Sequence, residues 1–181
     1  MSTTATGSTV TEAVARARTA GAPLTGRRAL VTGGSRGLGR EIAIAFAAAG
    51  ADVAIVSRKK DACTGLAAEL AEATGRRVTG HGAHVGEWDR LDGLLDEVED
   101  GLGPVDVLVN NAGIAPVYPS LHGVTEELFD KIVSVNLKGP FRMMAVAGRR
   151  MAARGGGAML NISSMASGRP TAGDLPYAAA Q

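Results

Sequence analysis

A glycine-rich stretch between an apolar run and a helical pattern contains the residues of this chain best suited to chemistry. It reads VTGGSRGLGREIAIAF, with Gly33, Gly37 and Gly39 around Ser35, Arg36 and Leu38. Glycine lets the backbone turn sharply and approach a ligand closely, and a helix start offers free N–H groups to an anion. A simple tight turn uses similar residues, but a position between a strand and a helix is the context that phosphate binding requires. The stretch therefore predicts a pyrophosphate site.

The end of the next apolar run, VAIVSRKK, bears on which dinucleotide would bind. Sites that prefer NAD usually place a carboxylate here for the ribose 2′-hydroxyl. This chain has Ser57 and Arg58 instead, followed by Lys59 and Lys60, and Arg36 adds a cation within the glycine-rich stretch. A guanidinium suits a 2′-phosphate, whereas the two lysines also fit a solvated basic face. The sequence predicts NADP(H) as the preferred cofactor, with NAD(H) as the alternative.

Short apolar runs alternate with amphipathic helical patterns along most of the chain. The expected strands are at 27–33, 51–58, 76–85, 104–113 and 156–164, and the expected helices at 39–51, 59–75, 87–103 and 125–155. The last of these is one helix or two, with Thr125 as N-cap. Strict alternation with apolar strands predicts a parallel sheet covered on both faces. We therefore expect an α/β fold with a doubly wound, Rossmann-type sheet over residues 24–181.

Composition narrows the class of protein. The 181 residues carry a net charge of +1, which favours neither nucleic acid nor an anionic membrane as a partner. No apolar run approaches the roughly 20 residues needed to span a bilayer. The single Cys63 cannot form an internal disulfide, which favours a reducing, cytoplasmic location, and it is read as a structural residue rather than a reactive thiol. His81 and His122 lack partners at ligand spacing, so we expect no metal site.

Residues 1–23 differ in composition from the rest of the chain. They are rich in Ser and Thr, with Arg16, Arg18 and a single acid, Glu12. The segment lacks the apolar core of a secretory signal, and its composition has some features of an organellar transit peptide. The preferred interpretation is a flexible N-terminal extension.

Five ordered motifs make the chain similar to one family. They are the T-G-x-x-x-G-x-G pattern at Thr32–Gly39, NNAG at Asn110–Gly113, VNLKG at Val135–Gly139, NISSMASG at Asn161–Gly168 and PYAAA at 176–180. With these motifs the chain resembles the short-chain dehydrogenase/reductases. The resemblance covers about residue 24 to residue 181. It implies hydride transfer between a nicotinamide and a small-molecule carbonyl or secondary alcohol, in a protein that forms homo-oligomers.

The resemblance also assigns roles to single residues. Ser164 would hydrogen-bond the substrate oxygen, Tyr177 would be the general acid and base, and Asn136 would hold a water in the proton relay. Ser163 is the alternative serine, ranked lower because it should point the other way. The residues that would line the cofactor cleft after the fourth strand are Asn110, Ala112, Gly113 and Ile114.

Two positions depart from the family pattern. The family usually has Asp-Val after its third strand, where the Asp holds the adenine amino group, and this chain has His84 and Val85. A histidine still can hydrogen-bond adenine with altered geometry, and a plain surface histidine is an equal interpretation.

The second departure is Gln181, which stands four residues after Tyr177, where the family has its catalytic lysine. Glutamine supplies no charge to favour a phenolate. The sequence also ends at this residue, so we expect a fold that is incomplete after the fifth strand and truncated in the catalytic helix. The alternative function is a cofactor-binding remnant that is catalytically impaired, because the lysine is missing. The substrate is left open, because Pro116–Tyr118 and Arg169–Asp174 are too generic to choose one.

Overall fold

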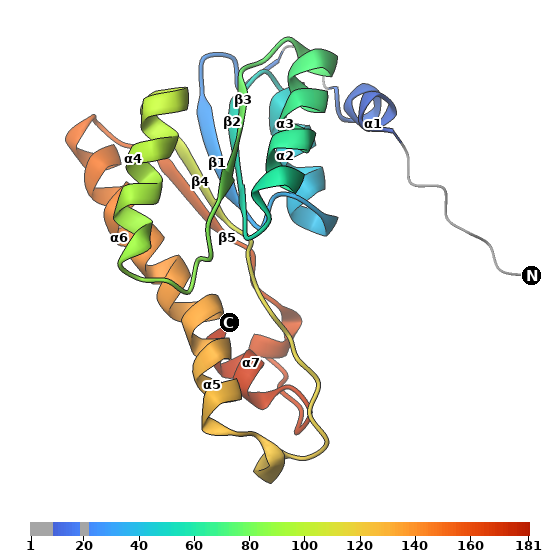
Figure 1. The fold of residues 1–181 in the computed structure, drawn as a ribbon, viewed down its shortest axis with the longest axis vertical. Helices are drawn as coiled ribbons and strands as arrows, with labels where there is room; N and C mark the ends of the chain where they lie inside the picture. The colour runs from blue at the N-terminus through green and yellow to red at the C-terminus, as the bar shows by residue number, and fades with distance from the viewer. Residues whose placement is uncertain (1–8, 19–21) are drawn as a thin grey trace, which may run out of the picture.

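The computed structural model describes residues 9–18 and 22–181 (Figure 1). Its elements are α1 (Val10–Ala17), β1 (Arg28–Thr32), α2 (Gly37–Ala48), β2 (Asp52–Ser57), α3 (Lys60–Thr74), β3 (Val78–Gly82), α4 (Arg90–Leu102), β4 (Val107–Asn110), η1 (Leu121–Gly123), α5 (Glu126–Val133), η2 (Ser134–Lys138), α6 (Gly139–Ala153), β5 (Ala158–Asn161), η3 (Met165–Ser167) and α7 (Leu175–Ala180). Here η1 and η3 are 3-10 turns and η2 is a π-helical turn.

The described strands form one parallel sheet in the order β3-β2-β1-β4-β5. Val31 lies between Ile55 of β2 and Val109 of β4, which places the buried centre of the sheet on these three strands. The order reverses direction at β1 and β4, as in a doubly wound sheet. The predicted Rossmann-type α/β fold is therefore confirmed, and each expected strand contains an observed one.

Two helical layers cover the sheet, one on each face (Figure 1). On one face Val53 and Ile55 pack with α2 and α3, and on the other Ala54 and Val56 pack with α4 and α6. Successive residues of a strand point to opposite faces, so an unbroken apolar run such as that of β2 supplies both cores. Such runs are typical of parallel sheets that are buried on both sides.

The residues expected to form one or two helices at 125–155 contain α5 and α6, which are joined directly by a π-helical turn. Thr125 accepts a hydrogen bond from the Leu128 N–H and begins α5, which confirms it as the N-cap. The π turn η2 then separates α5 from α6. A π turn holds one extra residue within a helix and is often found at functional sites. Asn136 lies in this turn.

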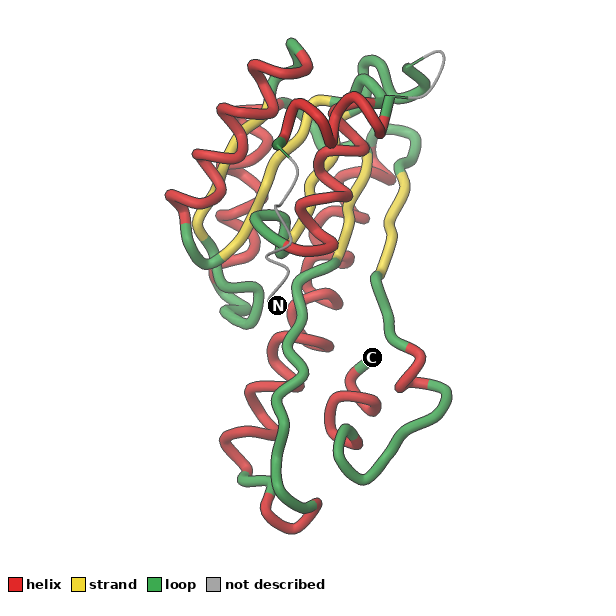
Figure 2. The backbone as a smooth tube through the Cα atoms, turned by 90° about the vertical axis from the view of Figure 1, so that its right-hand side faces the viewer, coloured by secondary structure: helices red, strands yellow, loops and turns green. Residues whose placement is uncertain are grey.

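A smaller lobe projects from the carboxyl edge of the sheet. The chain leaves β4, extends along this lobe and returns through η1 and α5, while η3 and α7 lie beside them (Figure 2). In the described structure α7 contacts α5, η2 and η3. Residues expected to take part in proton transfer are therefore carried by elements that pack on one another.

Part of the segment predicted to be a flexible extension is a helix. Thr9 and Glu12 form a reciprocal capping box at the start of α1, and Val10, Ala13 and Val14 are buried in the core formed with α2 and α3. Within residues 9–18 the segment is thus ordered and docked, because its apolar residues recur at helical spacing and have a surface to cover. Residues 1–8 and 19–21 lie outside the described ranges.

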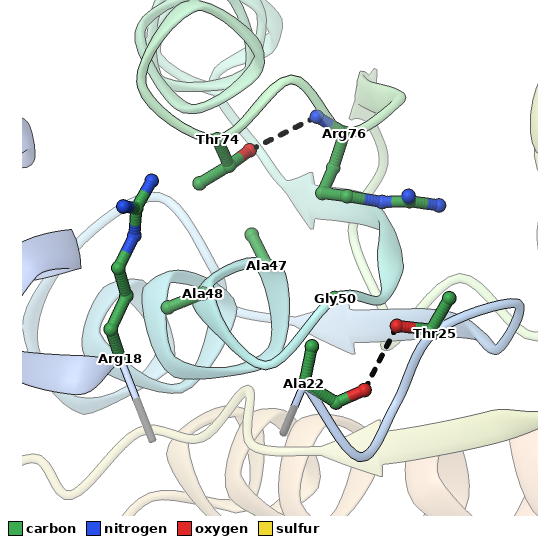
Figure 3. A pocket seen from close by; sticks show the side chains of 8 residues that line it. All are labelled: Arg18, Ala22, Thr25, Ala47, Ala48, Gly50, Thr74 and Arg76. Carbon is green, nitrogen blue, oxygen red and sulfur yellow. Dashed lines mark hydrogen bonds between the residues drawn. The ribbon is translucent and has the colours of Figure 1, made fainter. Parts of the chain in front are cut away.

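A shallow pocket of about 420 Å³ lies where this N-terminal segment meets the ends of α2 and α3 (Figure 3). Its lining includes Arg18, Gly50, Thr74 and Arg76. These residues lie at the C-terminal ends of helices, hence at the amino edge of the parallel strands. Ligands of open α/β sheets bind at the opposite, carboxyl edge, so this pocket is not the predicted cofactor site.

Candidate functional site

Two side chains, those of Thr32 and Asn111, hold the glycine-rich loop and the NNAG segment together. The buried Thr32 hydroxyl accepts hydrogen bonds from the N–H groups of Asn111 (3.0 Å) and Ala112 (3.2 Å), and it donates to the Val109 carbonyl (3.3 Å). In return, the Asn111 side-chain amide donates to the Thr32 and Gly33 carbonyls at 3.0 and 3.3 Å. The loops after β1 and β4 therefore form one fixed floor at the point where the strand order reverses.

Glycine is required where these two loops touch. A Cβ built on Gly39 would lie 2.3 Å from the Gly33 carbonyl oxygen and 2.4 Å from the Asn111 side-chain nitrogen. A Cβ on Gly33, whose φ is +65°, would lie 2.9 Å from the Ala112 Cα. Gly37 differs, because its φ is +55° but its Cβ would meet nothing within 4 Å. The inner side of the loop is packed, whereas the side at Gly37 is open to a ligand.

Two cations lie at the carboxyl edge without ionic partners. Arg36, just before α2, and Arg58, just after β2, are exposed, and neither side chain forms an ion pair or hydrogen bond within the described residues. Ser35 and Leu38 complete the loop, with Leu38 exposed. Ser57 is half-buried, and its hydroxyl lies 3.0 Å from the sulfur of the fully buried Cys63. These groups are available to an anionic ligand.

The turn after β3 is held between two elements. The Ala83 N–H donates to the Ser57 carbonyl (2.9 Å), and a Cβ on Gly139 of α6 would lie only 2.4 Å from the Val85 carbonyl oxygen. Within the turn, the Gly86 N–H donates to His84 Nδ1 at 3.1 Å. The half-buried His84 ring is thereby hydrogen-bonded within its own turn.

Asn136 joins the π turn to the segment after β4. Its side-chain oxygen accepts from the Ile114 N–H (2.9 Å), and its amide donates to the Ile114 carbonyl (2.7 Å). A Cβ on Gly113 would lie 3.3 Å from the Asn136 oxygen. The Asn110 amide donates to the Asn161 oxygen at 3.0 Å and ties the ends of β4 and β5 together.

The predicted proton-transfer residues follow β5 and lie in neighbouring elements. Ser164 is half-buried, and its hydroxyl accepts from the Ala166 N–H (3.2 Å) at the start of η3. Ser163 is exposed and donates to the Gln181 backbone oxygen (3.3 Å). Tyr177 is half-buried on α7, which contacts η3 and the π turn of Asn136. Their roles stay predictions, and the adjacency of their elements is the geometric support for them.

Sequence reasoning missed several residues that organise the site. Thr32, Asn111 and Asn161 make the hydrogen bonds between strand ends described above, and each lies within or beside a recognised motif. Polar residues at the ends of buried apolar runs are the signal that could have found them, because a buried polar group requires a partner. Tyr118 is also buried, and its hydroxyl has no partner in the described structure.

Two further classes of site find no support in the residues described. No helix among them is long and apolar enough to cross a membrane. Over the same ranges, no group of three or more His, Cys, Asp or Glu side chains is placed to hold a metal ion.

A family model described as short chain dehydrogenase matches residues 27–181. The chain therefore belongs to the short chain dehydrogenase family. It is 37% identical over 155 residues to dehydrogenase/reductase SDR family member 4 of Homo sapiens, covering 86% of this chain and 55% of that protein. It is 40% identical to L-xylulose reductase of Mesocricetus auratus, covering 85% of this chain and 59% of the relative. The chain thus spans little more than half the length of these relatives.

The fold also matches solved structures of the family. A metagenomic short-chain oxidoreductase solved in complex with NADP superposes with a TM-score of 0.82 at 32% identity. The match covers 87% of this chain and 71% of that one.

Proposed function

We propose that this chain forms the NADP(H)-binding part of an oxidoreductase that interconverts a carbonyl group and a secondary alcohol. The observation that carries the proposal is the fixed floor made by Thr32 between the loops after β1 and β4, with Gly37 left open above it. Because these loops are held in place before binding, little entropy is lost in ordering them when a ligand binds. The short-chain oxidoreductase that was solved with NADP has the same fold.

Different residues around the floor would bind different parts of the dinucleotide. Backbone N–H groups of the glycine-rich loop and the start of α2 would take the pyrophosphate. Arg36 and Arg58 have no ionic partner among the described residues and would pair with a 2′-phosphate, beside the Ser57 hydroxyl. The bound nicotinamide would supply the hydride chemistry.

The residues after β4 and β5 would handle the substrate oxygen. Ser164 would donate a hydrogen bond to it, and Tyr177 would exchange a proton with it. Asn136 would keep the segment after β4 in place through its paired hydrogen bonds to Ile114. A carbonyl or alcohol fits this set, because Ser164 and Tyr177, the two side chains that would meet the oxygen, are both hydroxyl groups.

One observation favours a second candidate, a chain that binds cofactor but turns over poorly. Gln181 stands where the family resemblance expects a lysine. Its neutral amide would give the Tyr177 phenolate no favourable charge. Introducing the cation with Gln181→Lys should raise turnover if the glutamine limits the reaction, and the same variant should leave the affinity for the adenosine half unchanged.

The binding part is tested by fluorescence titration of the 181-residue chain with NADPH and, in parallel, NADH. We expect saturable binding with NADPH the tighter ligand, and Arg58→Ala should weaken NADPH binding about tenfold while leaving NADH binding unchanged, because only NADPH carries the 2′-phosphate. Arg149→Ala is the matched control, since Arg149 is an exposed residue of α6. Equal affinities for the two cofactors would contradict the NADP preference.

The catalytic part is tested by following NADPH consumption with a panel of carbonyl compounds. Tyr177→Phe should abolish any turnover while keeping NADPH affinity, because it removes only the phenolic hydroxyl that would exchange the proton. A Tyr177→Phe variant with the parent rate would remove Tyr177 from the reaction.

A further inference from the structure

A second pocket lies in the smaller lobe. It has a volume of about 500 Å³ and lies between η1 and the start of α5 on one side and α7 on the other (Figure 2). Pockets that hold small organic ligands have volumes of roughly 300–1,000 Å³. The apolar residues that line it are Leu121, Val124, Phe129, Leu175, Pro176 and Ala179. The pocket therefore has the size and the lining to hold the apolar part of a small molecule.

This pocket is separate from the sites of the proposed function. On α7, Leu175 and Ala179 are four residues apart and share the helix face that lines the pocket. Tyr177 is two residues from each of them, and helical residues at that spacing do not face the same way. A ligand in this pocket would therefore contact the helix of Tyr177 from the side that faces away from the proposed substrate.

Three large side chains of the pocket leave much of their apolar surface in water. Leu121 and Phe129 are each 45% exposed, and Leu175 is 40% exposed. They belong to three different elements, η1, α5 and α7, so one ligand could cover all three at once. Removal of apolar surface from water is the dominant favourable contribution to most association. An apolar ligand body would therefore supply affinity at this place.

Carboxylates lie on both walls of the pocket. Among the described residues that line it, Glu126 alone is an acid or a base, and its carboxylate forms neither an ion pair nor a hydrogen bond within the described ranges. On the opposite wall, Asp174 directly precedes Leu175. The start of a helix attracts anions, but the first turn of α5 already carries both Glu126 and Glu127. A positive charge is thus favoured at this rim and a negative charge is disfavoured.

We propose that this pocket binds a small amphiphilic cation, with its apolar chain or ring between α5 and α7 and its positively charged nitrogen at Glu126. An ammonium group has only hydrogen-bond donors, and the Glu126 carboxylate has only acceptors, so the two groups satisfy each other. The apolar residues would supply most of the affinity, and Glu126 would select the charge of the ligand.

The test titrates the isotope-labelled chain with octylamine, octanol and octanoate, which have hydrocarbon chains of similar length and head groups of different charge. Amide NMR spectra give both the Kd of each compound and the residues that it contacts, and no turnover is needed. We expect shifts in η1, the start of α5 and α7. At low ionic strength the Kd of octylamine should be about two- to fivefold lower than that of octanol, as for one exposed ion pair. Octanoate should bind more weakly than octanol.

Glu126→Gln should make the Kd values of octylamine and octanol equal, because it removes the charge and keeps the size of the side chain. Glu127→Gln is the matched control, since Glu127 is an exposed residue of the same turn that does not line the pocket, and this variant should keep the preference for octylamine. Phe129→Ala should weaken the binding of all three compounds, because it removes part of the apolar lining.

Three results would overturn the proposal. One is no binding, or shifts outside the pocket. Another is octanol binding to the parent chain as tightly as octylamine. The third is a set of shifts at the same residues that depends on the concentration of the chain alone, because this would show that a second copy covers the pocket. The proposed cofactor binding would stand in each case, since NADPH titration measures it separately.

Discussion

The two edges of the sheet are built differently. At the β3 edge, helix α3 lies so close that a Cβ on Gly80 would be 2.4 Å from the Thr64 backbone nitrogen, and all five strand residues are half-buried. At the β5 edge all four strand residues are exposed, with Met159 and Leu160 each 43% accessible. The β3 edge carries the turn of His84, and the β5 edge leads to Ser164.

The contrast follows the division of roles proposed above. The strand on the side proposed to bind the adenosine half of the cofactor is half-buried under α3, whereas the strand that leads to the proposed proton-transfer residues exposes apolar side chains to solvent. An apolar strand edge is a template for pairing with another chain. Stability and cofactor affinity should therefore depend on the β3 side and the glycine-rich floor, with β5 contributing little.

The largest expected effect is on the floor itself. Gly39→Ala should weaken NADPH binding at least about 100-fold, because the new Cβ would collide with the Gly33 carbonyl and Asn111, and the backbone cannot yield cheaply. Titration with NADPH measures this. Gly65→Ala is the control, because Gly65 is an exposed residue of α3 and a Cβ built on it would have no neighbour within 4 Å. Unchanged binding by Gly39→Ala would refute the close approach.

A matched pair of leucines on adjacent strands tests the difference in packing directly. Leu108 on β4 is fully buried, and Leu108→Ala should cost about 2–5 kcal/mol of unfolding free energy through the cavity it leaves. Leu160→Ala on β5 should cost less than about 1 kcal/mol, because water already reaches the side chain. Urea denaturation of both variants measures the two values, and equal losses would end the distinction between the edges.

Asp52 anchors the covered side of the sheet in a pH-dependent way. Burial raises the pKa of its carboxyl, but hydrogen bonds from the Arg77 backbone and the Arg76 guanidinium, with the charges of both arginines, outweigh it and hold the pKa below its usual value. A carboxyl whose pKa is lower in the folded than in the unfolded state stabilises the folded protein at pH values above the unfolded-state pKa. This stabilisation is lost as the pH falls through the folded-state pKa.

Asp52→Asn should therefore cost about 1–3 kcal/mol at pH 7. The difference from the parent should begin to shrink below about pH 4, where the carboxyl of the unfolded chain becomes protonated, and should be lost as the pH falls through the lower pKa of the folded state. Unfolding curves at a series of pH values measure this, and a difference that is constant with pH would show that charge plays no part.

A charge on the β5 edge should have the smallest effect on folding free energy. Its expected effect is on self-association of the chain. Leu160→Lys should leave stability within about 1 kcal/mol and reduce self-association, because charged residues block edge-to-edge pairing. Light scattering against concentration measures association. Ala62→Lys adds the same charge on the exposed face of α3 and should not change it. Equal association by both lysine variants and the parent would show that β5 is not a contact surface.

The sequence predicted the sheet well because most of its strands are apolar runs bounded by glycine, proline or polar residues, whereas β3, which reads VTGHG, is the weaker pattern. Val53–Val56, for example, are apolar without a break and lie between a turn at Gly50 and the polar residues that begin at Ser57. The glycine-rich loop was found because its spacing and place between a strand and a helix are local features. The family followed from such local motifs, and the family model confirms it.

The parts that escaped prediction depend on partners distant in the chain. The helix that begins with the capping box of Thr9 and Glu12 was not predicted, because a helix this short is stable only where α2 and α3 offer a surface. The pairing of Asn136 with Ile114 needs a π turn, which no apolar period reveals. The hydrogen bond from the Gly86 N–H to His84 Nδ1 likewise forms only when the turn is folded.

The Thr32 hydroxyl has a consequence for hydrogen exchange. The amides of Asn111 and Ala112 lie beyond the end of β4, in a segment that ordinarily exchanges within the time of local fluctuations. Because both donate to a hydroxyl with almost no solvent access, which is itself bonded to Val109, neither can exchange until its hydrogen bond to Thr32 breaks. These two loop amides should therefore exchange more slowly than that of the exposed Gly113 beside them, and their rates should report on the separation of this loop from β1.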